Sequence, residues 1–104
     1  MNENIVRVHV TFKFPSAENA NAFAVLFRDE FIGRTRKEDG CLLYDVWQPN
    51  TDPLTLVLIE SWSSQQALDT HLAQDWLKAK LAGARELMGP DNEPAFHFCK
   101  SVMD

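Results

Sequence analysis

Hydrophobic and polar residues alternate near the start of the chain, and this pattern predicts a β-strand over residues 5–14. Valine or phenylalanine occupies every even position from 6 to 14, whereas arginine, histidine, threonine and lysine occupy the odd positions from 7 to 13. Because successive side chains of a strand point to opposite faces, this strand has one apolar face. Pro15 ends it, and Ser16 stands where a helix N-cap is expected.

The spacing of hydrophobic residues then changes to that of a helix. Phe23, Leu26, Phe27 and Phe31 lie three or four positions apart, so they form one apolar stripe along a helix. Gly33 is predicted to end this helix, because glycine is frequent immediately after a helix C-terminus.

Two strands are predicted in the middle of the chain. Gly40 precedes an apolar run over residues 41–48, and a turn-rich stretch, PNTDP, separates this run from a second one over residues 54–62. The centre of the second run, residues 56–59, is apolar at four consecutive positions. Such a strand needs a cover on both faces of its sheet.

A helical region and a final strand complete the pattern. Ser63, with Gln66 three residues later, matches a capping box and is predicted to start a helix. A second helical run covers residues 75–88 and ends at Gly89, and residues 94–103 form the last predicted strand.

The order of these elements predicts one domain over residues 1–104 with a ferredoxin-like α+β fold. The order β-α-β-β-α-β is typical of a four-stranded antiparallel sheet with helices on one face. Since the helices cover one face and the strand over residues 54–62 needs cover on both, the other face is predicted to meet a second copy of the chain. We therefore expect a homodimer that packs sheet on sheet, a dimeric α+β barrel.

Composition and charge narrow the classes of partner. The 104 residues carry a net charge of −5 and no basic stripe, which argues against nucleic acid and anionic membranes. No window approaches the ~18 apolar residues of a membrane span, and the N-terminus lacks a signal-peptide pattern.

Cys41 and Cys99 fit no metal or redox spacing and predict reduced, buried thiols in a cytoplasmic protein. No glycine-rich phosphate loop follows a strand, and we expect neither a cofactor nor a metal.

His71 is the first candidate for chemistry. On the predicted helix it shares a face with Leu68 and Leu72, so its imidazole is expected to point toward the sheet. Two interpretations remain open: a core histidine hydrogen-bonded near a helix end, or a general base.

Glu60 and Trp62 lie two positions apart on a strand and therefore share a face with Leu56 and Leu58. An unpaired carboxylate on an apolar face costs on the order of several kcal/mol, so Glu60 needs a partner. An ion pair with an arginine after the first helix is the favoured interpretation. Trp62 is either a core aromatic or a cavity residue, and its indole N–H needs an acceptor when buried.

Tyr44 and Asp45 must point to opposite faces of their strand, and the sequence does not say which of them faces the helices. His9 lies on the more polar face of the first strand, where a half-exposed histidine is the favoured interpretation. A metal site built from His9, His71 and His97 together with Glu60 has no short ligand spacing to support it.

The spaced motifs resemble those of the antibiotic biosynthesis monooxygenase (ABM) family of small dimeric α+β barrels. The stretch TRKEDGCLLYDV is followed, one strand later, by IESWSSQQALDTH. The resemblance covers nearly the whole chain and implies a ferredoxin-like fold, a homodimer and a small-molecule cavity between sheet and helices. The matching positions are Thr35, Arg36, Glu38, Gly40, Cys41, Tyr44, Glu60, Trp62, Ala67, Leu68 and His71.

The resemblance leaves the reaction open. Members of the family include quinol or polyphenol oxygenases without a cofactor, haem-degrading oxygenases and an autoinducer-2 phosphate isomerase. Many members carry a second histidine shortly after the first, where this chain has Trp76, and the first strand lacks the asparagine of the haem-degrading members. The isomerase-like members share Phe27-Arg28 and an end resembling LMGP, but they lack Trp62.

The function implied by the resemblance is a cofactor-independent monooxygenase acting on a quinol or polyphenol-like small molecule. His71 is then the general base, and the N–H of Trp62, or Tyr44 if it faces the cavity, donates to the developing oxyanion. Tyr44, Glu60 and His9 are the predicted substrate-binding residues. An autoinducer-2 phosphate-type isomerase and a non-catalytic small-molecule-binding dimer are the alternatives.

Overall fold

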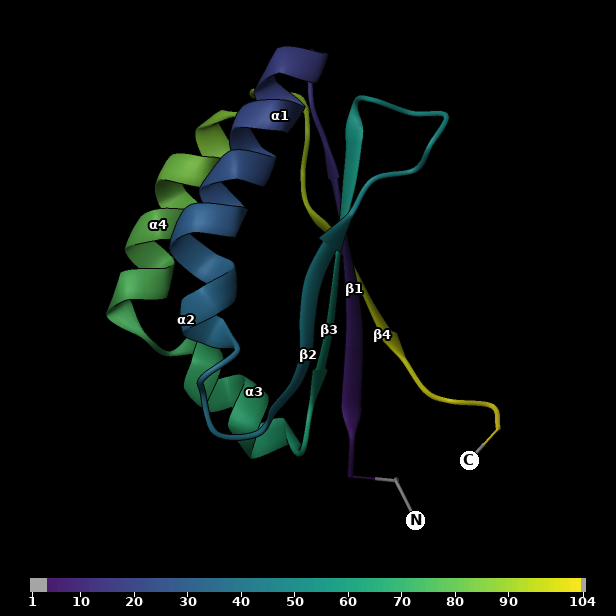
Figure 1. The fold of residues 1–104 in the computed structure, drawn as a ribbon, viewed down its shortest axis with the longest axis vertical. Helices are drawn as coiled ribbons and strands as arrows, with labels where there is room; N and C mark the ends of the chain where they lie inside the picture. Colours follow the sequence, from purple (N-terminus) through teal and green to yellow (C-terminus); the bar gives the residue numbers. More distant parts are fainter. Residues whose placement is uncertain (1–3, 104) are drawn as a thin grey trace.

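The computed structural model describes residues 4–103, which form a sheet with helices packed on one of its faces (Figure 1). This arrangement confirms the predicted ferredoxin-like α+β fold. The elements are β1 (Val6–Lys13), α1 (Ala17–Leu26), the π-helical turn η1 (Phe27–Ile32), α2 (Gly33–Thr35), β2 (Cys41–Trp47), β3 (Thr55–Trp62), α3 (Gln65–Leu72), α4 (Asp75–Glu86) and β4 (Ala95–Cys99).

The sheet has four strands in the order β2-β3-β1-β4, and each neighbouring pair is antiparallel. Glu60 of β3 lies opposite Tyr44 of β2, so both side chains point to the helix-covered face. His9 of β1 lies opposite Ile59 and His97, and these three side chains point to the other face. The register therefore decides which candidate residues can share one site.

Aromatic side chains form the centre of the core between the sheet and the helices. The rings of Phe23 and Phe27 stack with their centroids 4.8 Å apart, and those of Phe27 and Phe31 stack at 4.3 Å. Phe12 of β1 packs against Phe23 at 4.8 Å. All four side chains are buried. The apolar stripe predicted from helical spacing is thus the surface that attaches α1 and η1 to the sheet.

The first helix continues past Gly33, contrary to the prediction. Gly33 has a helical φ of −62°, and the backbone runs through η1 into α2, which ends at Thr35. A glycine ends a helix when it adopts a positive φ, and in this region Gly40 adopts it, with φ 85°. The sharp change of direction therefore comes at Gly40, directly before β2.

Helix α3 begins one residue later than predicted. Ser64 is its N-cap, and its hydroxyl accepts a hydrogen bond from the Ala67 backbone N–H at 3.1 Å. The backbone N–H of Ser63 instead donates to the carbonyl of Gly40 at 2.8 Å. Ser63 therefore belongs to the end of the sheet, and the predicted capping box is wrong by one position.

The last strand is shorter than predicted, and all of its residues are exposed. Strand β4 is the edge strand beside β1, so the helices do not bury it. Cys99 is exposed and Cys41 is half-buried, and both are free thiols. The expectation that both cysteines are buried is therefore wrong for Cys99.

No element among residues 4–103 covers the sheet face opposite the helices (Figure 1). Leu43 and Trp47 point to this face and are 40% and 56% exposed. The homodimer remains a prediction that this open face motivates. In the same part of the chain, every helix is too short or too polar to cross a membrane.

Candidate functional site

A cavity of about 440 Å³ lies between the sheet and helices α3 and α4. Three polar side chains come from the sheet and α3: Tyr44 from β2, Glu60 from β3 and His71 from α3. Three charged side chains, Lys78, Arg85 and Glu93, line the part of the cavity formed by α4 and the segment that follows it. Most of the remaining lining is apolar. An apolar cavity with a few convergent polar groups is the usual form of a small-molecule site. The apolar lining includes Val10, Phe12, Phe27, Leu58, Leu77 and Leu81.

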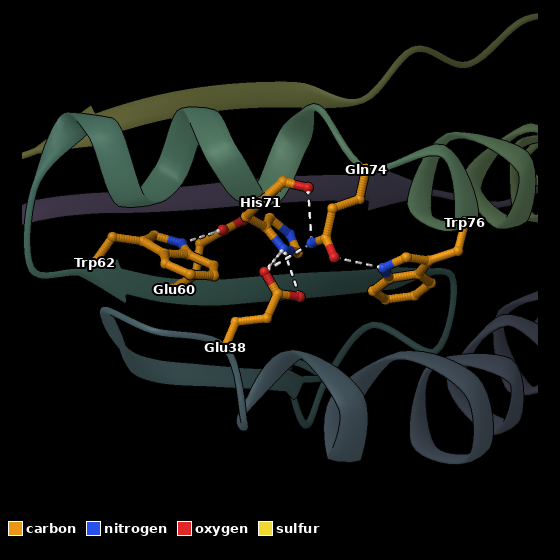
Figure 2. A network of polar contacts seen from close by, with 6 residues as sticks. All are labelled: Glu38, Glu60, Trp62, His71, Gln74 and Trp76. Carbon is orange, nitrogen blue, oxygen red and sulfur yellow. Dashed lines mark hydrogen bonds and ion pairs between the residues drawn. The ribbon is translucent and has the colours of Figure 1, made fainter.

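Glu60 is a buried carboxyl held by a neighbouring indole. Its Oε1 accepts a hydrogen bond from Nε1 of Trp62 at 2.7 Å (Figure 2). Burial raises the pKa of Glu60 above its ordinary value, and this hydrogen bond and the nearby His71 oppose the rise. The carboxyl therefore holds its proton to a higher pH than an exposed glutamate does.

The arginine that was expected to pair with Glu60 is engaged elsewhere. Arg36 donates from Nε to the carbonyl oxygen of Tyr44 at 2.9 Å, and its guanidinium lies 3.7 Å from Oδ1 of Asp45. Asp45 also accepts a hydrogen bond from Nε1 of Trp47 at 3.0 Å. Among the described residues no arginine pairs with Glu60, so the indole hydrogen bond takes the place of the predicted ion pair.

His71 is held by a carboxylate that comes from the loop between α2 and β2. Its Nδ1 lies 3.0 and 3.1 Å from the two carboxylate oxygens of Glu38. A carboxylate accepts hydrogen bonds, so in the neutral ring this contact assigns the proton to Nδ1 and leaves the lone pair on Nε2. The His71 side chain is 2% exposed and that of Glu38 is 18% exposed. The pair has the arrangement of an oriented general base.

Two aromatic rings fix the plane of the His71 imidazole. Trp62 stacks on it with centroids 4.6 Å apart and 30° between the planes, and Tyr44 meets it edge-on at 5.7 Å. Burial, together with the negative charge of Glu60, raises the pKa of Tyr44 well above its usual range. The phenol therefore stays protonated at neutral pH and can donate a hydrogen bond.

Four of the five predicted site residues come together. Tyr44, Glu60 and His71 line the cavity, and Trp62 supports them without being part of the lining. His9 points to the opposite face of the sheet and does not reach this cavity. Because side chains alternate along a strand, a shift of one residue in β1 would be needed to bring His9 to the helix-covered face.

The three histidines do not meet. His71 is on the helix-covered side, whereas His9 and His97 are cross-strand neighbours on the other face. Within residues 4–103, no group of three or more His, Cys, Asp or Glu side chains is arranged to hold a metal ion.

Glu38 is the site residue that sequence reasoning did not single out. It lies 33 positions before His71, and the charged stretch around it has no periodicity that predicts a buried partner. Gly40 turns the loop back against α3, where a Cβ atom on Gly40 would lie 2.5 Å from Cβ of Ala67. The available signal was the place of Glu38 in the motif that resembles the ABM family.

Residues 5–80 match the sequence model of a family described as antibiotic biosynthesis monooxygenase. No curated protein matches the chain. Among solved structures, Rv0793 from Mycobacterium tuberculosis is 30% identical, with 94% of this chain and 95% of that chain covered and a TM-score of 0.79.

Two further structures are named as candidate antibiotic biosynthesis monooxygenases. The protein from Deinococcus radiodurans is 28% identical, with 95% of this chain and 96% of that chain covered and a TM-score of 0.78. The protein from Caulobacter crescentus CB15 is 25% identical, with 97% and 92% covered and a TM-score of 0.82.

Proposed function

We propose that this chain, which belongs to the antibiotic biosynthesis monooxygenase family, oxygenates a quinol or polyphenol-like small molecule without a cofactor. The family and the similarity to candidate monooxygenases support a small-molecule monooxygenase-like function in general. The particular proposal is that the substrate itself supplies the electrons that reduce oxygen. The protein then has to supply a base, a hydrogen-bond donor and an apolar cavity.

The observation that carries the proposal is the His71–Glu38 pair at the edge of an otherwise largely apolar cavity. Nε2 of His71 takes the proton of a phenol, while Glu38 accepts the hydrogen bond from Nδ1–H and stabilises the imidazolium that forms. A base positioned in this way typically contributes about 10²–10⁴-fold to the rate.

With a hydroquinone as the substrate, the proposed reaction consumes one O₂ and gives a hydroxyquinone and one water. The phenolate transfers one electron to O₂, and the resulting radical and superoxide combine to form a C–O bond at a ring carbon. The proton held by His71 converts this peroxide into a hydroperoxide. The O–O bond then breaks as the ring C–H proton leaves, and the products are a hydroxyquinone and one water. The substrate loses four electrons, and O₂ gains four.

Tyr44 is the better candidate for the donor to the developing oxyanion. Its side chain lines the cavity and its phenol remains protonated. The indole N–H of Trp62 is already donated to Glu60 at 2.7 Å. We therefore assign Trp62 a supporting role, in which it holds Glu60 and stacks on His71.

A second function is favoured by two cationic side chains in the lining. Lys78 and Arg85 of α4 both contribute to the cavity, and Arg85 also pairs with Glu93 at 2.7 Å. Cations at a cavity suit an anionic substituent such as a phosphate group. An isomerase of a phosphorylated ketone, with His71 moving a proton beside the carbonyl, is therefore the alternative proposal.

Labelled oxygen tests the proposal. Purified protein is treated with a chelator and incubated with a panel of hydroquinones and polyphenols under ¹⁸O₂, without added flavin, haem or metal. We expect one labelled atom in the oxidised product and one in water for each turnover. Product oxygen derived from water, or no oxygen uptake with any compound, would overturn it. Rearrangement of a phosphorylated ketone without O₂ would assign the isomerase, and saturable binding alone would assign a binding protein.

A further inference from the structure

The carboxylate that orients His71 is itself held by a second hydrogen-bonded pair. Nε2 of Gln74 donates to Oε1 of Glu38 at 2.8 Å, and the same nitrogen lies 3.2 Å from the backbone oxygen of His71. Nε1 of Trp76 donates to Oε1 of Gln74 at 2.8 Å. Figure 2 shows these groups as one chain of hydrogen bonds that runs from Trp76 to His71.

These hydrogen bonds run in a single direction, which Trp76 and Glu38 set from opposite ends of the Gln74 amide. An amide side chain can donate from its nitrogen or accept at its oxygen, and the two ends have nearly the same shape. An indole N–H can only donate, so the end of Gln74 that faces Trp76 has to be the oxygen. The amide nitrogen then faces Glu38, whose carboxylate oxygen accepts its hydrogen bond.

Trp76 is well placed to hold this direction because its ring packs against two other side chains. The guanidinium of Arg34 lies 4.0 Å from the centroid of the Trp76 ring. The ring of Phe31 lies 6.0 Å away at 51°. Arg34 of α2 and Phe31 of η1 thus hold the indole N–H of Trp76 in place at the start of α4. Trp76 is far in sequence from the loop that carries Glu38.

Glu38, Gln74 and Trp76 are all outside the cavity lining. They act on a bound molecule only through His71, so they are expected to change the turnover rate more than the affinity. Gln74 is also the N-cap residue of α4, but its side chain makes no capping hydrogen bond. Replacing that side chain therefore leaves the helix cap as it is.

We infer that Gln74 and Trp76 are positioning residues, which hold the Glu38 carboxylate so that His71 keeps its proton on Nδ1 and presents Nε2 as the base. Without the indole hydrogen bond, nothing fixes the oxygen end of the Gln74 amide, so its side chain is free to move and its hydrogen bond to Glu38 is weakened. The carboxylate then moves, and the Nε2–H tautomer of His71 becomes populated. The catalytic consequence rests on the proposed function, whereas the tautomer does not.

The test compares Trp76→Phe with the wild type, using ¹⁵N NMR of the histidine ring nitrogens in the substrate-free protein. The phenylalanine keeps a six-membered aromatic ring for Arg34 and removes the indole N–H together with the rest of the pyrrole ring. We expect the wild-type His71 signals to show Nδ1–H, and the variant to show a mixture of tautomers. Trp47→Phe is the matched control, because it removes an indole donor that serves Asp45 on the opposite sheet face. It should leave the His71 signals unchanged.

A second variant keeps the inference testable if Trp76→Phe folds poorly. Gln74→Met preserves the length of the side chain and removes all three of its hydrogen bonds, so it should shift the tautomers in the same direction. With a substrate that the wild type turns over, both variants should lower kcat by about 10–100-fold, the range seen for groups that orient metal-bound histidines. KM should stay within about twofold, since neither residue lines the cavity.

Unchanged tautomers in folded Trp76→Phe and Gln74→Met proteins would overturn the inference. So would a wild-type His71 that carries its proton on Nε2. A tautomer shift in a protein that oxidises no phenol would instead support the positioning role and count against the proposed function. The positioning role of Gln74 and Trp76 and the proposed oxygenase function can therefore be refuted independently.

Discussion

Trp62 stacks on His71 with 4.6 Å between ring centroids, and its indole N–H is donated to Glu60. One side chain therefore fixes the plane of the proposed base and the position of the buried carboxyl next to it. Since the N–H is already donated to Glu60, a substrate oxyanion has to find its donor elsewhere, and the phenol of Tyr44 is a neutral donor that lines the cavity.

This relationship predicts unequal effects of two conservative substitutions. Tyr44→Phe removes the proposed oxyanion donor and should lower kcat by about 10²-fold, the lower end of the range for such donors. Trp62→Phe keeps a ring against His71 and should lower kcat by less than about tenfold. Steady-state kinetics with the same phenol measures both. A larger loss of kcat for Trp62→Phe than for Tyr44→Phe would indicate that the indole N–H of Trp62, and not Tyr44, donates to the oxyanion.

The raised pKa of Glu60 predicts a pH-dependent gain in stability for Glu60→Gln. Burial raises the folded-state pKa above the unfolded one, so the folded protein binds this proton more tightly. The stability that comes from protonated Glu60 is therefore complete below its unfolded pKa and is lost as the pH rises through its folded pKa.

Glutamine stays neutral and can still accept the hydrogen bond from Trp62. Glu60→Gln should therefore unfold at a higher denaturant concentration than the wild type at about pH 8, and the difference should shrink at about pH 4. An equal difference at both pH values would show that the proton on Glu60 is not the cause.

Gly40 is predicted to be intolerant of alanine. Its φ is 85°, and a Cβ atom there would lie 2.5 Å from Cβ of Ala67 and 2.7 Å from Oγ of Ser63. Gly40→Ala should lower the free energy of unfolding by at least about 1–2 kcal/mol from the left-handed backbone alone. The loop that carries Glu38 should shift as well, which lowers kcat.

Gly33→Ala is the matched control for this prediction. Gly33 is helical, and outside its chain neighbours and its own helix backbone no described atom lies within 4 Å of the position of its added Cβ. The substitution should stabilise the protein by about 0.4–1 kcal/mol. Thermal unfolding of the two variants compares them directly, and a Gly40→Ala protein as stable as Gly33→Ala would contradict the structural account.

The open face of the sheet predicts a homodimer. Leu43, Trp47 and Val57 share this face, on which residues 4–103 place no covering element. Light scattering at micromolar concentration should give about 24 kDa, which is twice the chain mass of 11.9 kDa. Val57→Lys should shift the protein to monomer, whereas Val25→Lys on the exposed side of α1 should not. A monomeric wild type would refute the sheet-on-sheet packing.

Much of the fold could be predicted from local patterns. The alternation over residues 5–14 and the stripe from Phe23 to Phe31 predicted β1 and the first helix, because each pattern has the period of its element. Spacing also placed His71 on the inner face of α3. The extension of the helix past Gly33 was missed, since backbone φ at a glycine depends on packing that the sequence does not display.

The site could be predicted only in part, because it is assembled by contacts between distant segments. Alternation along β3 placed Glu60 and Trp62 on one face, which the structure confirms, but the hydrogen bond between them replaces the ion pair with an arginine that was expected for Glu60. The contact between Glu38 and His71 depends on how a loop folds back, and no periodicity encodes it. The faces of Tyr44 and His9 depended on strand register, which becomes known only when the sheet is assembled.

The most direct test of the account is the kcat of His71→Ala on a hydroquinone that the wild type oxidises. His97→Ala, which changes an exposed histidine on the other side of the sheet, is the control. The account predicts a loss of about 10²–10⁴-fold for His71→Ala, with unchanged far-UV circular dichroism, and little loss for His97→Ala. A folded His71→Ala protein that keeps its turnover within about threefold would contradict the assignment of His71 as the general base.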